Sequence, residues 1–211
     1  MKIMKIKYLI DKIKRNHFEK SNSEKPWLNK NAVLALEGLI QKSDIIVECG
    51  SGRSSIWFAK NAGKLISIEN SPEWYEIVNK KLKKAQLTNV DYHLVEYSFD
   101  GEQENTEYTN VIHNLLDNSI AFGLIDGGPR SYCAKAIIPK LKNGGILILD
   151  DAQYAFPSFS GVNGAFSNES DIPTIWNSTP LIWKEVYSLT RNWKRINTTD
   201  GITDTLFLIK P

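Results

Sequence analysis

The chain has 211 residues, of which 42% are hydrophobic and 24% are charged, so it can bury the core of one globular domain. Its net charge is only +2, which gives no electrostatic reason to expect a nucleic-acid partner. No apolar run approaches the roughly 20 residues that span a bilayer, and lysines interrupt the apolar residues near the N-terminus, unlike a signal peptide. Two well-separated cysteines, Cys49 and Cys133, favour a reducing, cytoplasmic setting.

Residues 1–30 are predicted to form a helix and a linker that precede the main domain. Isoleucines recur every three or four residues from Ile3 to Ile13, with lysines between them, which predicts a basic amphipathic helix. Two interpretations of its apolar side stay open. It packs on the body or on a second subunit, which would make the protein a homodimer, or it lies on a membrane surface. Residues 31–211 are predicted to form a single domain.

From residue 31 onward, strand and helix patterns alternate along the chain. The predicted strands are 44–48, 64–69, 90–95, 121–126 and 145–150, and the predicted helices are 32–40, 54–61, 71–86 and 132–141, with a short helix at the end of the polar stretch 98–119. Strands that alternate with helices indicate right-handed crossovers and a parallel sheet covered on both faces. The chain is therefore predicted to have an α/β fold.

The alternation stops after the fifth predicted strand. Residues 152–180 contain aromatics, glycines and prolines without a clear period, which is typical of an insertion that acts as a lid or binding loop. A disordered insertion is the alternative. Two strand-like runs, 193–198 and 205–209, then flank a turn containing Asp200 and Gly201, which predicts a terminal antiparallel hairpin.

Acidic residues stand at the ends of several predicted strands, where ligands bind in open α/β sheets. These acids are Glu48, Glu69, Asp126 and Asp150. Glu48 leads into a loop of glycines and serines, residues 50–55. A dinucleotide-binding loop would have a third glycine where Ser55 stands, and a carboxylate at Glu48 would suit an ammonium group better than a pyrophosphate. A tight turn without a ligand is the other alternative.

Four stretches of the chain resemble a known family. The class I S-adenosylmethionine-dependent methyltransferases have a first motif and a second-strand acid that resemble VECGSGRSS (47–55) and ISIENSP (66–72). Their fourth and fifth strands resemble LIDGGPRSY (124–132) and LKNGGILILDDAQ (141–153), most closely in the subgroup of catechol and caffeoyl-CoA O-methyltransferases. The resemblance implies a Rossmann-like fold with a seven-stranded, mostly parallel sheet whose last strand is reversed.

The resemblance also implies S-adenosylmethionine as the cofactor and assigns residues to it. Gly50 and Gly52 would let the backbone approach the cofactor, and N–H groups of the following helix would receive its carboxylate. Glu48 would face its amino group, and Glu69 would accept hydrogen bonds from the ribose hydroxyls. The residues expected to bind the cofactor are Glu48, Gly50, Ser51, Gly52, Arg53, Ser54, Ser55, Glu69, Asn70, Ser98, Asp126 and Gly127.

Acids after the fourth and fifth strands hold a divalent metal in the catechol-type subgroup. The resemblance therefore implies Asp126, Asp150 and Asp151 as ligands of Mg²⁺ or Ca²⁺. The lysine that the subgroup has near the first acid is missing here, and Arg130 is present instead. The resemblance therefore does not assign the base of the subgroup to a residue here. A site without a metal is the alternative, with Asp126 in contact with the cofactor or the substrate and with Asp150 and Asp151 bonded to loop amides. Asp126 and Asp151 are the catalytic candidates.

The expected activity is the methylation of a small molecule at oxygen, because a hydroxyl acceptor needs the base or metal that these acids can provide. A nicotinamide-dependent oxidoreductase on a similar sheet is one alternative, which Glu48 and Ser55 disfavour. A partner protein that binds S-adenosylmethionine without catalysis is the second. The sequence does not identify the acceptor.

Overall fold

The computed structural model describes residues 2–96, 107–176 and 179–211, so the predicted cofactor contact Ser98 lies outside the described residues. The strands are β1 (Ile45–Cys49), β2 (Lys64–Glu69), β3 (Val90–Leu94), β4 (Ile120–Ile125), β5 (Leu141–Leu149), β6 (Ile175–Trp176), β7 (Thr179–Pro180), β8 (Lys194–Thr199) and β9 (Asp204–Ile209). The α-helices are α1 (Lys2–Ser21), α2 (Lys30–Leu39), α3 (Arg53–Asn61), α4 (Pro72–Lys84), α5 (Glu107–His113), α6 (Arg130–Ile137) and α7 (Trp183–Thr190). Three short 3₁₀-helices are η1 (Ile138–Lys140), η2 (Ala152–Tyr154) and η3 (Glu169–Asp171).

One seven-stranded sheet forms the centre of the molecule, with the strand order β3-β2-β1-β4-β5-β9-β8. Strands β1 to β5 pair in parallel, whereas β9 runs antiparallel to both of its neighbours, β5 and β8. The predicted sheet with a reversed last strand is confirmed. The central strands β1 and β4 are almost wholly buried, as expected for parallel strands that helices cover on both faces.

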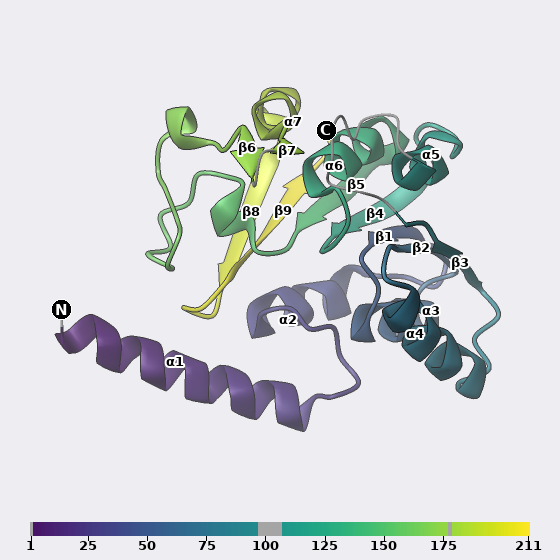
Figure 1. Cartoon of the computed structure of the whole chain (residues 1–211), viewed down its shortest axis with the longest axis horizontal. Coiled ribbons are helices and arrows are strands. Elements are labelled where there is room, and N and C mark those ends of the chain that lie inside the picture. The colour runs from purple at the N-terminus through teal and green to yellow at the C-terminus, as the bar shows by residue number, and fades with distance from the viewer. Residues whose placement is uncertain (1, 97–106, 177–178) are drawn as a thin grey trace.

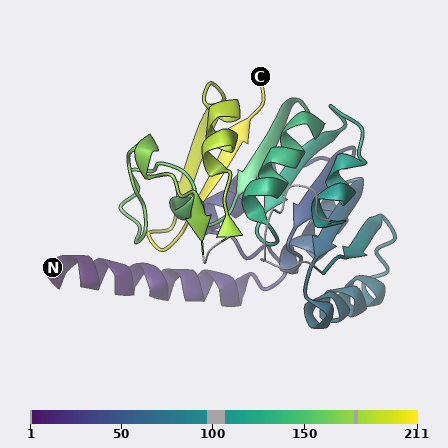
Figure 2. The same cartoon turned by 45° about the horizontal axis from the view of Figure 1, so that its top comes forward.

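Helices cover the sheet on both faces (Figures 1 and 2). One apolar core lies between the sheet and α2, α3 and α4, and contains the fully buried Leu36 and Phe58. The other lies between the sheet and α5, α6 and α7, and contains the fully buried Tyr108 and Ile137. Because the parallel strands all end at the same edge of the sheet, the loops after β1, β2, β4 and β5 are brought together there.

The boundary between α6 and β5 differs from the prediction. The helix was expected over 132–141 and the strand over 145–150, but α6 ends at Ile137 and β5 already begins at Leu141. Pro139, which has no backbone N–H, lies in the 3₁₀ turn between them. Leu141 then pairs with Ile120 across a shift in strand register, so the glycines that follow belong to the strand.

Helix α7 was not predicted, and it lies between the predicted insertion and the terminal hairpin. Its buried residues Trp183, Val186 and Thr190 have helical spacing, but eight residues give too short a pattern to stand out in sequence. The hairpin itself is confirmed, with Thr199 opposite Asp204 at its turn. The predicted N-terminal helix is also confirmed as α1. Within the described ranges, no helix has the length and apolarity needed to cross a membrane.

Candidate functional site

Gly50 lies where the loop after β1 touches the loop after β4. Its φ is +87°, and a Cβ on it would lie 2.6 Å from the backbone nitrogen of Gly127. The carbonyl oxygen of Cys49 ties the loops together, because it accepts hydrogen bonds from the N–H groups of Asp126 (2.9 Å) and Gly127 (2.7 Å). A glycine at position 50 is therefore required by contact between two loops of the chain itself, whatever approaches it from outside.

Gly52, at the start of α3, has open space around it. Within the described residues, a Cβ on Gly52 would have only the Oγ of Ser54 within 4 Å, at 3.9 Å. The guanidinium of the next residue, Arg53, lies 5.4 Å from the ring centre of Trp27, a cation–π contact. The backbone at Gly52 is thus accessible to a ligand, while the Arg53 side chain already has a partner.

The carboxylate of Glu48 is fully buried beneath the glycine loop. Its Oε2 accepts hydrogen bonds from the hydroxyls of Ser55 (2.5 Å) and Ser67 (2.7 Å), and Ser55 in turn accepts one from the N–H of Gly52 (2.9 Å). Oε1 has no hydrogen-bond partner in the part of the chain that the structure describes. Burial raises the pKa of Glu48 to about 7, although the hydrogen bonds from serine hydroxyls lower it. A cationic group would supply both the missing donor and the missing positive charge.

The Glu48→Gln variant should lose part of the pH dependence of folding stability. The folded pKa of about 7 lies above the unfolded value of about 4.3, so folding favours the protonated carboxyl. The contribution of Glu48 to stability is therefore complete at low pH and is lost as the pH rises through about 7. Glutamine does not ionise, so the variant should melt at a higher temperature than the wild type at pH 8, with a smaller difference at pH 5.

Calorimetric melting at the two pH values checks this expectation. Glu76→Gln, which changes an exposed acid on α4, is the matched control and should follow the wild type at both. A Glu48→Gln variant whose melting temperature differs from that of the wild type by the same amount at pH 5 and pH 8 would contradict the raised pKa of Glu48.

Glu69, at the end of β2, accepts four hydrogen bonds from its own chain. Oε1 accepts from the backbone N–H groups of Asn70 and Ser71, each at 2.9 Å. Oε2 accepts from the backbone N–H (3.0 Å) and the hydroxyl (2.7 Å) of Ser51. A carboxylate has about four acceptor sites, so these bonds occupy them all. The predicted contact of Glu69 with ribose hydroxyls requires Ser51 to give up at least one of its bonds.

Two tyrosines that the sequence analysis did not assign support the same loop. The hydroxyl of Tyr108, on α5, donates to the carbonyl oxygen of Ile68 (2.7 Å) and accepts from the N–H of Gly50 (3.1 Å). The hydroxyl of Tyr92, on β3, lies 2.7 Å from that of Ser51. No motif marks either tyrosine, and only the packing of α5 and β3 beside the loop brings their hydroxyls to it.

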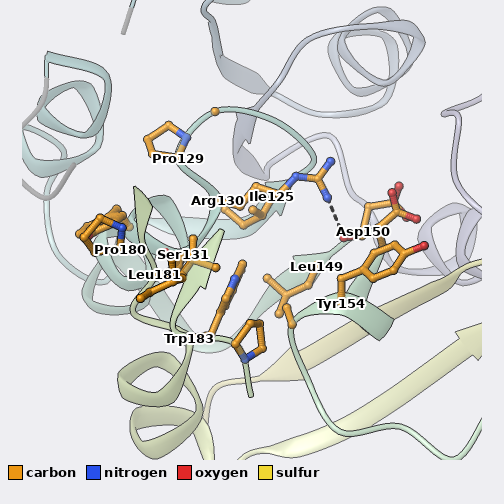
Figure 3. Close-up of a pocket in the computed structure, with 16 residues that line it drawn as sticks. Ile125, Pro129, Arg130, Ser131, Leu149, Asp150, Tyr154, Pro180, Leu181 and Trp183 are labelled. Carbon is orange, nitrogen blue, oxygen red and sulfur yellow. Dashed lines mark hydrogen bonds between the residues drawn. The ribbon is translucent and has the colours of Figure 1, made fainter. Parts of the chain in front are cut away.

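Asp126 follows β4, and its carboxylate meets the guanidinium of Arg130. Nη2 of Arg130 donates to the backbone oxygen of Asp126 (2.5 Å) and lies 3.3 Å from its Oδ1. Nη1 donates to the backbone oxygen of Asp150 (3.1 Å), the bond drawn in Figure 3. Desolvation, opposed by Arg130, raises the pKa of Asp126 to about 7, although 34% of its side chain is exposed. Arg130 therefore joins the ends of β4 and β5 beside a carboxyl that titrates near neutral pH.

Asp150 and Asp151, two of the acids predicted as metal ligands, each accept a hydrogen bond from a side chain outside this group of acids. Oδ1 of Asp150 accepts from the hydroxyl of Thr205 (2.8 Å), and Oδ1 of Asp151 accepts from the amide of Gln153 (3.2 Å). Burial and the charges of Asp126 and Asp151 raise the pKa of Asp150 well above its ordinary value. Among the described residues, no three Asp, Glu, His or Cys side chains are grouped so that they could hold a metal ion. The Mg²⁺ or Ca²⁺ site therefore stays a prediction, and Arg130 supplies a positive charge between the strand ends.

A pocket of about 550 Å³ opens beside these acids, between the ends of β4 and β5 and the segment that leads to α7. Apolar side chains make up much of its wall, among them Ile125, Leu149, Ala155, Leu181 and Trp183. Arg130, Asp150 and Asp151 also line it. Figure 3 shows Arg130 and Asp150 on one side of the pocket and Pro180 and Leu181 on the other. Asp126 and Gly127 do not line the pocket, but their chain neighbours Ile125 and Gly128 do, and Gly127 contacts Gly50 of the glycine loop.

This fold and this site define a class of protein. A sheet with a reversed β9, a glycine loop after β1, an acid at the end of β2 and a pocket beside β4 and β5 are the features of the class I S-adenosylmethionine-dependent methyltransferases. Residues 47–152, half of the chain, match the family described as a methyltransferase domain. The chain belongs to this methyltransferase family.

Solved structures agree with this assignment at the level of fold. A proposed methyltransferase from Streptococcus mutans, in complex with SAH, is 11% identical with a TM-score of 0.55, and the match covers 87% of this chain and 99% of that one. A protein from Staphylococcus aureus, proposed to be a caffeoyl-CoA O-methyltransferase, is 16% identical with a TM-score of 0.56, and the match covers 93% of this chain and 90% of that one.

A curated relative is known to act on RNA. The 23S rRNA (uracil(1939)-C(5))-methyltransferase of Legionella pneumophila is 29% identical over 120 residues, which cover 55% of this chain. The match covers only 24% of that protein, so the chain spans about a quarter of the length of the curated relatives it matches.

Proposed function

We propose that the chain transfers the methyl group of S-adenosylmethionine to an oxygen atom of a small, largely apolar acceptor. The pocket of about 550 Å³ at the ends of β4 and β5 is the observation that carries the proposal. Pockets of roughly 300–1,000 Å³ with apolar walls and a few polar groups are typical of small-molecule sites. Contact between Gly50 and Gly127 sets this pocket beside the glycine loop, as transfer between two bound molecules requires.

The glycine loop fits the proposed cofactor. S-adenosylmethionine, when bound, supplies a methyl group that its positively charged sulfur activates for transfer. The open backbone at Gly52 and the unpartnered Oε1 of Glu48 support binding of its amino-acid end. Glu69 and Ser51, which already exchange hydrogen bonds, are the proposed ribose contacts. The other loop residues predicted to bind the cofactor remain part of this proposal.

Asp126 is the proposed general base. A hydroxyl acceptor must lose its proton as the methyl group arrives, and a carboxyl with a pKa of about 7 is suited to accept it near neutral pH. Arg130 holds this carboxylate at the boundary between the glycine loop and the pocket. Asp151, which lines the pocket, is the proposed polar contact for the acceptor hydroxyl.

Transfer of labelled methyl groups to a panel of small hydroxylated compounds tests the proposal. The variant Leu181→Trp fills part of the pocket, so it should lower kcat/KM for the acceptor at least about tenfold, while calorimetry shows unchanged affinity for S-adenosylhomocysteine. Leu116→Trp, at an exposed position outside the pocket, is the matched control. Chelation of divalent metals should leave the rate unchanged, because Arg130 already supplies a positive charge between the ends of β4 and β5.

Three results would contradict parts of this proposal. Methylation of a 23S rRNA fragment without methylation of any small compound would make RNA the acceptor. Product analysis that finds the label on nitrogen or carbon would exclude O-methylation. A rate that chelation abolishes and Mg²⁺ restores would reinstate the metal site.

A further inference from the structure

Helix α1 is attached to the body through polar residues and, near its C-terminal end, through Phe18, which packs against the apolar core beside α2 and α3. Nη1 of Arg15 donates to the hydroxyl of Thr203 (3.0 Å) and lies 3.8 Å from the carboxylate of Asp200. Asp11, one turn before Arg15, packs against Gly201. All three contacted residues belong to the turn between β8 and β9. Figures 1 and 2 show α1 along the outside of the molecule, with its N-terminal part projecting beyond the sheet.

The opposite side of α1 is apolar and exposed. Ile6, Leu9, Ile10 and Ile13 have the i, i+3, i+4, i+7 spacing of one helix face, and 57%, 57%, 46% and 67% of their surface is exposed. These four residues are called the α1 stripe below. A helix that only covers its own domain buries its apolar side, whereas α1 turns Asp11, Arg15 and Phe18 inward and the α1 stripe outward.

Exposed lysines border the α1 stripe on both sides. Lys7 and Lys14 are three and four residues from Ile10 and lie along one border, and Lys12 is three residues from Leu9 on the other. The sequence of α1 contains seven basic and two acidic residues, a net charge of +5. The whole chain carries +2, so the residues outside α1 together carry −3. Positive charge is thus concentrated on a helix that exposes an apolar face.

We propose that the α1 stripe docks on the surface of an anionic lipid bilayer, with α1 parallel to the membrane plane. The stripe would enter the boundary of the acyl chains, and the bordering lysines would meet anionic headgroups. A nucleic acid would match the lysines but would leave the apolar side chains exposed. Two α1 helices packed stripe to stripe would bring their lysines together, which like-charge repulsion disfavours.

Cosedimentation of the full chain with vesicles tests the proposal. We expect binding to vesicles of equal parts phosphatidylcholine and phosphatidylglycerol, weak binding to phosphatidylcholine alone, and partial release by salt. The double variant Leu9→Gln, Ile13→Gln should lower the partition coefficient at least about tenfold. The double variant Lys7→Gln, Lys14→Gln should also lower it about tenfold, and only for the anionic vesicles.

A matched control removes the same charge elsewhere. The double variant Lys80→Gln, Lys84→Gln changes two exposed lysines of α4 and should bind like the wild type. All these positions are exposed, so circular dichroism and melting should show an intact fold in every variant.

Clear outcomes overturn the proposal. The proposal is wrong if the wild-type chain does not bind the anionic vesicles. It is also wrong if the stripe variant binds them as well as the wild type does. If the stripe variant instead converts a dimer into a monomer during sedimentation and vesicle binding is absent, the α1 stripe is an interface between two copies. Loss of binding to a 23S rRNA fragment in the lysine variant, again without vesicle binding, would make α1 an RNA contact.

Discussion

Replacing Gly50 by alanine should destabilise the fold by about 3 kcal/mol or more. The φ of +87° is strained for any residue with a Cβ, and the new methyl group would lie 2.6 Å from the backbone nitrogen of Gly127. A backbone atom held by the hydrogen bond from Gly127 to Cys49 cannot move aside as a flexible side chain can. Urea unfolding monitored by circular dichroism measures the change.

Gly52→Ala is the matched control, since it adds the same methyl group two residues later in the same loop. It should change the free energy of unfolding by less than about 1 kcal/mol, because the space around Gly52 is open. It should nevertheless weaken the binding of S-adenosylhomocysteine in calorimetry, because that space is the proposed approach of the cofactor. Equal losses of stability in both variants would show that the two glycines do not have the separate roles assigned here.

Asp126→Asn should lower kcat by about 100-fold or more, the usual effect of losing a general base. The bond from Arg130 to the backbone oxygen at position 126 does not need the carboxylate, so the loop should keep its shape. Affinity for S-adenosylhomocysteine should therefore change little. Steady-state kinetics with saturating cofactor, together with calorimetry, separates these two effects.

Asp151→Asn distinguishes the two catalytic candidates. Asparagine can still accept a hydrogen bond from Gln153 and can still contact an acceptor hydroxyl, so kcat should fall by less than about tenfold. A large loss in Asp151→Asn with little loss in Asp126→Asn would transfer the role of base to Asp151.

Much of the fold could be predicted because it depends on local patterns. Apolar strands such as β1 and β4, and the N-cap at Ser71 before α4, are visible in short windows of sequence. The predicted start of β5 at residue 145 was wrong, because Leu141 becomes a strand residue only by pairing with Ile120. Likewise, α7 has too few residues for its helical pattern to be recognised from the sequence alone.

The location of the candidate site could be predicted from the sequence, but the contacts of its residues could not. Strand ends meet at one edge of a parallel sheet, so Glu48 and Glu69 could be assigned to it from their positions alone. The hydrogen-bond and stacking partners of the site residues could not be predicted. The hydrogen bond from Ser51 to Glu69 and the stacking of Arg53 on Trp27 form only in the folded chain. The contacts of Arg130 could not be predicted for the same reason, since its reach to both strand ends is a tertiary contact.

The placement of β9 constrains the order in which this protein can fold. β8 is made before β9, yet among the described residues its only neighbour in the large sheet is β9, which itself inserts against β5. β8 can therefore join the large sheet only through β9, and we expect the hairpin to add to β5 after the strands that precede it in the chain. The side-chain amide of Asn29 can form its hydrogen bonds only after this step, because their acceptors, Thr198 and Thr205, lie about 170 residues later in the chain. Contacts this distant along the chain slow folding, and until they form the edge of β5 is exposed to wrong partners and aggregation.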